Sequence, residues 1–501
     1  MGKSFFTLED AKISFSLFCC VYGIGTLGMP GNYSRAGPYL ATTAMVFMAF
    51  ANIYASVVCS RVLLGAPRTV KTYGDLGEWC MGSFGRYLVV LAQMATCLLL
   101  PCAFLVLGGT LLVDLFPDTL NSSVWIVFMA ASLLPICLTP TLKEGASAAF
   151  AGCAGTIIAD AIGLSILLYG MQGHPSVPKP DLSFKQVAGA FGNLSLAYGA
   201  GIVIPALQRQ HSDPTRMPRI IVVTLTFISC LFLTIATTGY SAVGCQIASN
   251  LLFTIFPDPA TGLTDMGFRP HKGAVVVAFL FMQLHITIAF GVLVYPAFYI
   301  LERLLLGMHK KKKSIAEGGH PDYPEHSTPS AAIITLEQPL ERRLSKASVT
   351  SFADLEQTCD DEDSYDAELA EYSKPGNAIK YVLLRVSVVA VLVALAIAFK
   401  DHFREFTDVI GASSVTLTCI ILPIVFYLKT NWEQVSWVEK ILGCIVALIC
   451  GFLGCYVTYT SGEELFSSTK SSVKFPFCSP EFETEVYYNA SALNQPTTFG
   501  L

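Results

Sequence analysis

Two short glycine-rich strings are the residues in this chain best suited to binding a ligand. Residues 22–25 read Tyr-Gly-Ile-Gly and residues 198–201 read Tyr-Gly-Ala-Gly, and a proline follows each string, at Pro30 and Pro205. Both lie in apolar runs long enough to cross a bilayer, where every N–H and C=O released from a helix must find another partner. Two interrupted spans at matching positions are a sequence pointer to the substrate site of a secondary transporter, so we predict a transporter.

An opened membrane helix exposes two kinds of backbone group. The N–H groups at the start of its second half suit a carboxylate, whereas the carbonyls at the end of its first half suit an ammonium group or a cation. A site with both ends would bind the backbone of an α-amino acid zwitterion. Our carboxylate candidates are the amides near Gly25, Thr26 and Leu27 in the first break, and Gly23 is a further substrate-binding candidate there. Our amine candidates are carbonyls of the second break, at Tyr198, Gly199 and Gly201. We expect Tyr22 and Tyr198 to line or close the pocket.

The alternative for each string is close helix packing, which small residues also allow in membranes. The repetition of the string in both halves of the chain favours a binding site. No fixed charge is expected at mid-depth beside these strings, and a charged substrate side chain would lack a buried partner there. We therefore predict a neutral α-amino acid as the substrate.

Two ionisable side chains lie deep in the predicted spans, Asp160 and His285. Ionisable groups are rare and costly inside a membrane, so each is a candidate for ion coupling. His285 is our first choice because an imidazole titrates near neutral pH, which suits a proton relay. A structural role, with hydrogen bonds to Ser, Thr or backbone groups, is the alternative for both. Sodium coupling would need oxygen ligands, for which Thr287 is the candidate, and we favour protons.

The composition places the chain in the membrane class. Of its 501 residues, 53% are apolar and 14% are charged, which indicates many spans in a lipid bilayer rather than one soluble core. The net charge of −5 is not gathered on a basic face, so we expect no nucleic-acid partner. Most of the 16 cysteines lie in apolar runs and no C-x-x-C pair occurs, so we predict neither a metal site nor a cofactor.

Hydropathy predicts an all-α membrane protein of about eleven spans with a cytoplasmic N-terminus. Lysine and arginine are enriched on that side, above all in the cluster at 309–313. The odd number of spans places the C-terminus and two N-glycosylation acceptors, Asn121 and Asn489, on the opposite side. The predicted spans lie near residues 13–35, 39–63, 87–114, 123–142, 151–171, 187–208, 219–241, 273–303, 379–399, 405–428 and 438–460.

The other segments complete the predicted organisation, in which residues 1–306 hold spans 1–8 and residues 377–460 hold spans 9–11. The loop 307–376 is polar and ends in an acidic stretch, so we expect a disordered cytoplasmic loop. Its string Arg-Arg-Leu-Ser makes Ser345 a phosphorylation candidate, with an inert tether as the alternative. The tail 461–501 is expected to be extracytoplasmic. Cys245 and Cys478 are the two cysteines placed on that side, where a disulfide between them is permitted.

Four strings in order along the chain resemble motifs of the amino acid/auxin permease family, a branch of the superfamily with the LeuT-like fold. They are GIGTLGMPGNYSRAG (23–37), YGAGIVIPALQRQHSDPTRMP (198–218), YPAFYILE (295–302) and FTDVIGASSVTLTCIILPIVFYLK (406–429). The second and fourth are fairly specific, whereas the loop 307–376 and the tail are longer than the family minimum. The resemblance implies a five-plus-five inverted repeat with spans 1 and 6 broken, a substrate site between them and spans 3 and 8, and coupling to protons or sodium.

The sequence leaves other functions open as alternatives. A sodium-coupled or exchange-type transporter, or one for another small organic acid, is the nearest. A polytopic receptor or nutrient sensor would also explain many spans and a long loop. A channel would show a filter loop or a ring of charge, and a membrane enzyme a convergent nucleophile and base, and neither pattern is visible. We expect a non-enzymatic monomer in the plasma membrane or a vacuolar or lysosomal membrane.

Overall fold

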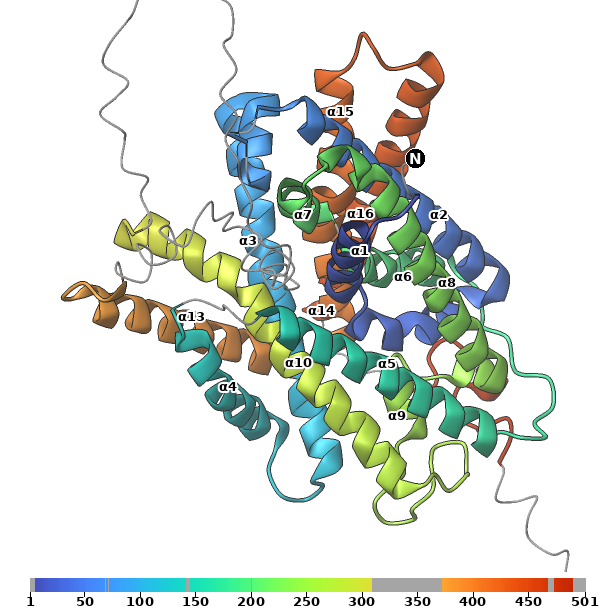
Figure 1. The fold of residues 1–501 in the computed structure, drawn as a ribbon. Helices are drawn as coiled ribbons and strands as arrows, with labels where there is room; N and C mark the ends of the chain where they lie inside the picture. Colours follow the sequence, from blue (N-terminus) through green and yellow to red (C-terminus); the bar gives the residue numbers. More distant parts are fainter. Residues whose placement is uncertain are drawn as a thin grey trace, which may run out of the picture.

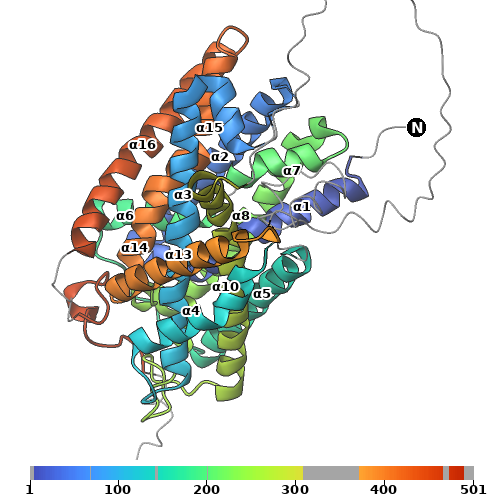
Figure 2. The same cartoon turned by 90° about the vertical axis from the view of Figure 1, so that its left-hand side faces the viewer.

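The chain folds into a bundle of helices that run back and forth between two ends (Figures 1 and 2). The computed structural model describes residues 5–67, 69–70, 72–140, 145–199, 201–308, 372–466 and 473–489. We call the end that carries residues 211–216 and 431–436 the N side, because the first helix begins there. We call the other end, which carries residues 116–121 and 473–489, the C side. Figure 1 shows the N side at the top and the C side at the bottom.

The helices of the first half follow one another with short connections. They are α1 (Leu8–Val21), the 3-10 turn η1 (Ile24–Gly28), α2 (Met29–Gly65), α3 (Tyr73–Leu115), α4 (Ser122–Leu138) and α5 (Gly145–Gly170). Thr7 and Asp10 form a capping box at the start of α1, and Thr72 and Asp75 form another at the start of α3, which satisfies the first free amides of both helices.

The second half repeats this plan and ends in the segment 473–489, which lies on the C side. Its elements are α6 (Phe184–Ala197), η2 (Gly201–Val203), α7 (Ile204–Gln210), η3 (Pro214–Arg216), α8 (Met217–Val243), η4 (Gly244–Gln246), α9 (Leu251–Ile255), α10 (Lys272–Leu301), η5 (Glu302–Leu306), α13 (Asn377–Phe399), α14 (Phe403–Ile410), η7 (Gly411–Val415), η8 (Leu417–Ile421), α15 (Leu422–Thr430), α16 (Trp437–Leu465) and η9 (Pro480–Phe482).

The predicted number of membrane passes agrees with these helices. Nine helices in the described residues are long and apolar enough to cross a membrane. One of them contains two passes, because Gly37 interrupts α2 with a φ of 69° just before Pro38. The 17-residue apolar helix α4 supplies one more, which brings the count to the predicted eleven. The third span is longer than predicted: α3 starts at Tyr73 and bends at Gly82 before it enters the predicted range.

The two predicted helix breaks are confirmed. The first span stops at Val21 and resumes as α2 at Met29, and the sixth stops at Ala197 and resumes as α7 at Ile204. Span 1 runs from the N side to the C side, whereas span 6 runs in the opposite direction. This antiparallel relation of two broken spans is what the predicted inverted repeat requires.

Span 10 is irregular as well, and it packs tightly against span 6. Two π-helical turns, η7 and η8, separate α14 from α15. A Cβ atom on Gly411 would lie 1.9 Å from the carbonyl oxygen of Gly192 in α6, so this approach requires glycine. Gly411 is the glycine of the predicted F-x-x-x-x-G motif that begins at Phe406, and its local role is therefore to let the two spans touch.

Candidate functional site

The two helix breaks meet at Gly25. A Cβ atom on Gly25 would lie 2.8 Å from the Cβ and 2.9 Å from the Cα of Ala197, the last residue of α6. Glycine at this position therefore lets the backbone of the first break touch the end of the helix that leads into the second. The structure thus brings together the two strings that the sequence analysis singled out.

A cavity of about 120 Å³ lies against both breaks. The first break contributes Gly23, Ile24 and Gly25 to its wall, and the second contributes Gly199, Ile202 and Val203. Apolar side chains of α3 and α10 form the opposite wall, among them Leu100, Phe104, Val292 and Leu293. None of the described residues that line this cavity carries a fixed charge; its titratable groups are His285 and the thiols of Cys19, Cys20 and Cys419.

Besides the two tyrosines, three of the proposed binding residues, Thr26, Leu27 and Gly201, do not line the cavity. The amide of Thr26 is occupied, because it donates to the Gly23 carbonyl at 3.0 Å. This is the first hydrogen bond of the 3-10 turn. Ile24 and Gly25 line the cavity, and their amides come before this first hydrogen bond of the turn. They are therefore better placed to receive a carboxylate than the amides of Thr26 and Leu27.

Tyr22 and Tyr198 do not line the cavity in this structure, and their closing of the pocket stays a prediction. Both rings pack against Phe232 of α8, at centroid distances of 6.1 Å and 5.2 Å. The Tyr198 hydroxyl donates to Ser229 at 2.8 Å, so a neighbouring helix satisfies it away from the cavity. Neither tyrosine is part of the cavity wall.

Asp160 of α5 is held directly by the first break. Its carboxylate accepts hydrogen bonds from the Tyr22 hydroxyl at 2.8 Å and from the Thr26 hydroxyl at 3.1 Å, and its side chain is buried. The two residues lie on either side of Gly23 and Gly25, so the carboxylate joins the interrupted part of span 1 to span 5. Thr26 thus contributes through its side chain rather than through its amide.

His285 of α10 lies beside the same break. A Cβ atom on Gly23 would lie 3.0 Å from the His285 Nε2, and the ring borders the cavity, whereas its Nδ1 faces Gly152 of α5. The structure therefore places both predicted titratable residues beside the first break. Thr287 is not placed there: its hydroxyl donates to the Gln283 carbonyl of its own helix, and it does not line the cavity.

A buried ion pair that the sequence analysis missed joins α2 to α14. Arg35 of α2 donates to Asp408 of α14 at 2.8 Å, and both side chains are almost completely buried. The two residues are 373 positions apart in sequence and lie near the ends of different spans. The pair ties span 1 to span 10 next to the close contact between Gly192 and Gly411.

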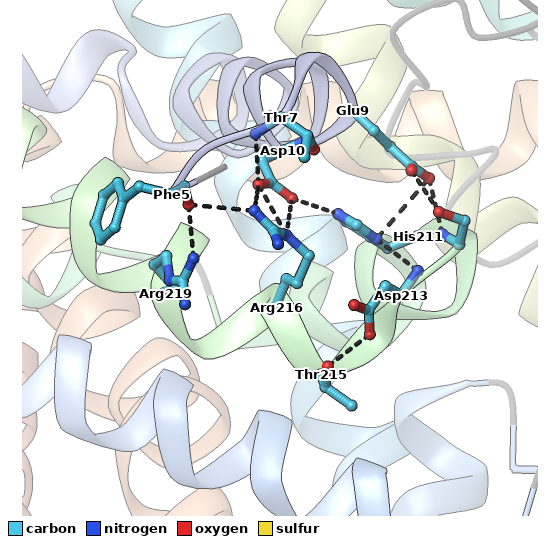
Figure 3. A network of polar contacts seen from close by, with 10 residues as sticks. Phe5, Thr7, Glu9, Asp10, His211, Asp213, Thr215, Arg216 and Arg219 are labelled. Atoms are coloured by element: carbon cyan, nitrogen blue, oxygen red, sulfur yellow. Dashed lines mark hydrogen bonds and ion pairs between the residues drawn. The ribbon is translucent and has the colours of Figure 1, made fainter. Parts of the chain in front are cut away.

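A second polar network ties the start of α1 to the connection between α7 and α8 on the N side (Figure 3). The Asp10 carboxylate accepts from Arg216 at 2.6 Å and from His211 Nε2 at 2.9 Å. His211 Nδ1 in turn accepts from the Asp213 amide, which assigns the proton to Nε2. Glu9 accepts from the amide of Ser212 at 2.7 Å. These bonds hold α1, α7 and α8 together as one group on the N side.

A third network is buried where α4, α10 and α13 meet. Arg385 donates to Glu302 at 2.7 Å, and the side-chain exposures of the two residues are 1% and 0%. The guanidinium also donates to the carbonyls of Cys137 and Thr139. Four aromatic rings surround it at 5.1–5.6 Å, those of Tyr295, Phe298, Tyr372 and Tyr381.

Removing this guanidinium is expected to destabilise the protein. Arg385→Met leaves a buried carboxylate without its cation, which typically costs about 3–5 kcal/mol, and should lower the thermal unfolding temperature in detergent. Adding Glu302→Gln to that variant should restore part of the loss, because the buried charge is then removed too. Arg61→Met is the control, since its partner Glu439 is 3.1 Å away in a solvent-exposed pair worth about 0–1 kcal/mol. Equal unfolding temperatures for Arg385→Met and Arg61→Met would contradict this prediction.

The remaining predicted sites lie on the C side or outside the described residues. Asn121 caps the start of α4 and Asn489 lies in the segment 473–489, so both glycosylation candidates are on the same side. Cys245 and Cys478 are joined by a disulfide. Ser345 and most of the loop 307–376 fall outside the described residues.

Comparison with known proteins gives the family. Residues 11–462 match the family described as transmembrane amino acid transporter protein, and the chain belongs to this family of transporters. The amino acid transporter AVT1D of Arabidopsis thaliana is 23% identical over 278 residues, which cover 52% of this chain and 50% of that protein. The vacuolar amino acid transporter 4 of Saccharomyces cerevisiae is 22% identical over 262 residues, or 50% of this chain and 36% of that protein. The matched region thus spans about half the length of the first of these curated relatives, and less of the second.

Two solved structures resemble the chain over most of its length. MhsT in complex with L-phenylalanine gives a TM-score of 0.42 at 13% identity, covering 92% of this chain and all of that one (100%). The Eremococcus coleocola manganese transporter gives a TM-score of 0.49 at 12% identity, covering 94% of this chain and 91% of that one.

Proposed function

We propose that this protein is a secondary active transporter that moves neutral α-amino acids across a membrane by alternating access, coupled to protons. The observation that carries the proposal is the cavity between two broken spans, which borders residues of both breaks and has no fixed charge among its described lining residues. The family and the printed names of the relatives support amino acids as the substrate class.

The substrate backbone would bind between the two breaks. The amides of Ile24 and Gly25 receive the carboxylate, and the carbonyls at the end of α6, near Ala197 and Gly199, receive the ammonium group. The substrate side chain then points to the apolar wall of α3 and α10. A fixed charge on that side chain would be buried without a partner, which makes charged amino acids poor substrates.

Proton coupling would run through Asp160, His285 or both. The hydroxyls of Tyr22 and Thr26 both donate to the Asp160 carboxylate. A movement of span 1 relative to α5 would change these partners, which would link the protonation of the carboxyl to the conformational cycle. Coupling to sodium, or exchange without an ion, is the alternative mechanism within the same function.

The structure fits a state that is closed on the C side. The Arg35–Asp408 pair and the packing of α6 on span 10 block that side, whereas Ser16, Cys19 and Cys20 of α1 extend the cavity wall towards the N side. We place the N side in the cytoplasm and the C side outside it, in the plasma membrane or a vacuolar or lysosomal membrane.

Competition for uptake tests the substrate class. With a labelled neutral amino acid in proteoliposomes, unlabelled apolar and small amino acids should inhibit uptake at least tenfold more strongly than lysine or glutamate at the same concentration. The uncharged wall of the cavity is the reason for this order. Stronger inhibition by lysine or glutamate would refute a neutral substrate and would require a charged partner that the cavity does not contain among its described residues.

A further inference from the structure

The segment 473–489 belongs to the C-terminal tail described above, and from here on we call this segment the tail. It is attached to several elements on the C side. The disulfide between Cys245 and Cys478 ties it to the end of α8, and Cys478 also forms an antiparallel bridge with Pro180 in the α5–α6 connection. The amide of Asp181 donates to the Phe477 carbonyl at 2.9 Å. The backbone of Phe477 is therefore positioned by neighbours on both sides.

Gln246 holds the second half of the tail. Its side-chain amide donates to the carbonyls of Phe482 at 3.0 Å and Glu485 at 2.6 Å, and its side-chain oxygen accepts from the Tyr487 amide at 3.1 Å. One side chain thus makes three bonds to tail backbone. A segment that merely follows the last span would not need this anchoring.

The ring of Phe477 lies near two arginines. Its centroid is 5.6 Å from the Arg35 guanidinium carbon and 5.1 Å from that of Arg404. Arg35 belongs to α2 and Arg404 to α14, the two helices that the Arg35–Asp408 pair joins. An aromatic face attracts both cations, so the ring allows two like charges to come near each other in the closed arrangement.

The tail also forms part of the wall of a cavity. This cavity of about 230 Å³ is lined by Arg404, Asp265, Lys474 and Phe477 among others. Lys474 bridges to Asp265 at 2.8 Å, and this pair closes the rim between the tail and the α9–α10 connection. Separation of α2 from α14 on the C side would change the contacts of Phe477 with both helices.

We infer that the tail is a disulfide-tethered lid on the C side and that Phe477 is a positioning residue, which holds Arg35 in its ion pair with Asp408. The lid stabilises the state closed on the C side and so sets how often the path opens there. This inference rests on alternating access in the proposed function, but the closure itself can be measured without transport.

Hydrogen–deuterium exchange of the full chain in lipid nanodiscs tests the lid. Phe477→Leu keeps an apolar side chain but removes the ring. It should raise the exchange of residues 29–36 and 403–410 roughly two- to thirtyfold, the range expected for losing a cation–π contact. Phe477→Trp retains an aromatic face and should exchange like the parent protein. Tyr488→Phe is the matched control in the tail, because it loses only the hydroxyl bond to the Gln172 carbonyl.

Two further variants separate positioning from general loosening. In the background of Asp408→Asn, which removes the ion pair, Phe477→Leu should add little further exchange. The double change Cys245→Ser and Cys478→Ser should raise exchange in the same two helices; if it does not fold, the Phe477 series decides. Parent-like exchange in Phe477→Leu, or equal exchange in Phe477→Leu and Phe477→Trp, overturns the inference. If neither the parent protein nor any variant transports amino acids but the exchange pattern is as predicted, the proposed function is refuted and the lid is supported.

Discussion

Gly25→Val is expected to abolish amino acid uptake while leaving the folded protein in the membrane. The position of a Cβ atom at Gly25 is already only 2.8 Å from the Ala197 Cβ, so valine must push the two helix breaks apart. Overpacking of this kind typically costs about 1–3 kcal/mol, and here the strain falls on the amides of Ile24 and Gly25 that are proposed to hold the carboxylate. Initial uptake rates per reconstituted molecule measure the effect, with an expected loss of at least tenfold.

A matched glycine variant separates this effect from a general loss of folding. Gly462→Val is the control, because a Cβ atom at Gly462 meets no other atom within 4 Å. It should transport at the parent rate. Gly25→Ala, which introduces the same close contact with a smaller side chain, should fall between the parent and Gly25→Val. Parent-like uptake by Gly25→Val would remove the first break from the substrate site.

Asp160→Asn is expected to retain exchange of substrate but to lose accumulation driven by a pH gradient. The amide has nearly the shape of the carboxylate and can still accept a hydrogen bond from Tyr22 or Thr26, but it cannot carry a proton. One pH unit supplies about 1.4 kcal/mol per proton, which supports roughly tenfold accumulation. That accumulation should fall to none in Asp160→Asn, as measured by labelled substrate inside proteoliposomes.

His285→Ala gives the second arm of this experiment, because His285 lies beside the same break. Loss of accumulation in one variant alone identifies that residue as the proton carrier, and loss in both indicates a shared relay. Asp118→Asn on the exposed α3–α4 connection is the control and should accumulate substrate normally. If both Asp160→Asn and His285→Ala still concentrate substrate under a proton gradient alone, neither residue couples protons to transport.

Local features of the sequence predicted the parts of the site that depend on the backbone. The breaks follow from Gly23, Gly25, Gly199 and Gly201 with their nearby prolines, because glycine and proline weaken a helix wherever it packs. Asp160 and His285 were identifiable because an ionisable group inside a span is rare. The predicted topology permitted a disulfide between Cys245 and Cys478, because they were the two cysteines assigned to the extracytoplasmic side.

Features that depend on distant helices were not predictable in the same way. The rings of Tyr22 and Tyr198 turn towards Phe232, and nothing in their own strings specifies this neighbour. Arg35 and Asp408 lie at span ends, where charged residues are ordinary, and only folding shows that they pair. The direction of Thr287 was equally open, because a helical threonine can bond its own backbone, as it does here.

Gradient-driven uptake tests the central claim most directly. The purified protein is reconstituted into liposomes, and uptake of a labelled neutral amino acid is measured with a pH gradient and no sodium, with a sodium gradient and no pH difference, and with neither. The account predicts accumulation of roughly tenfold per pH unit in the first condition and only equilibration in the other two. Accumulation under sodium alone would contradict proton coupling, and absence of amino acid uptake in all three conditions would contradict the proposed function.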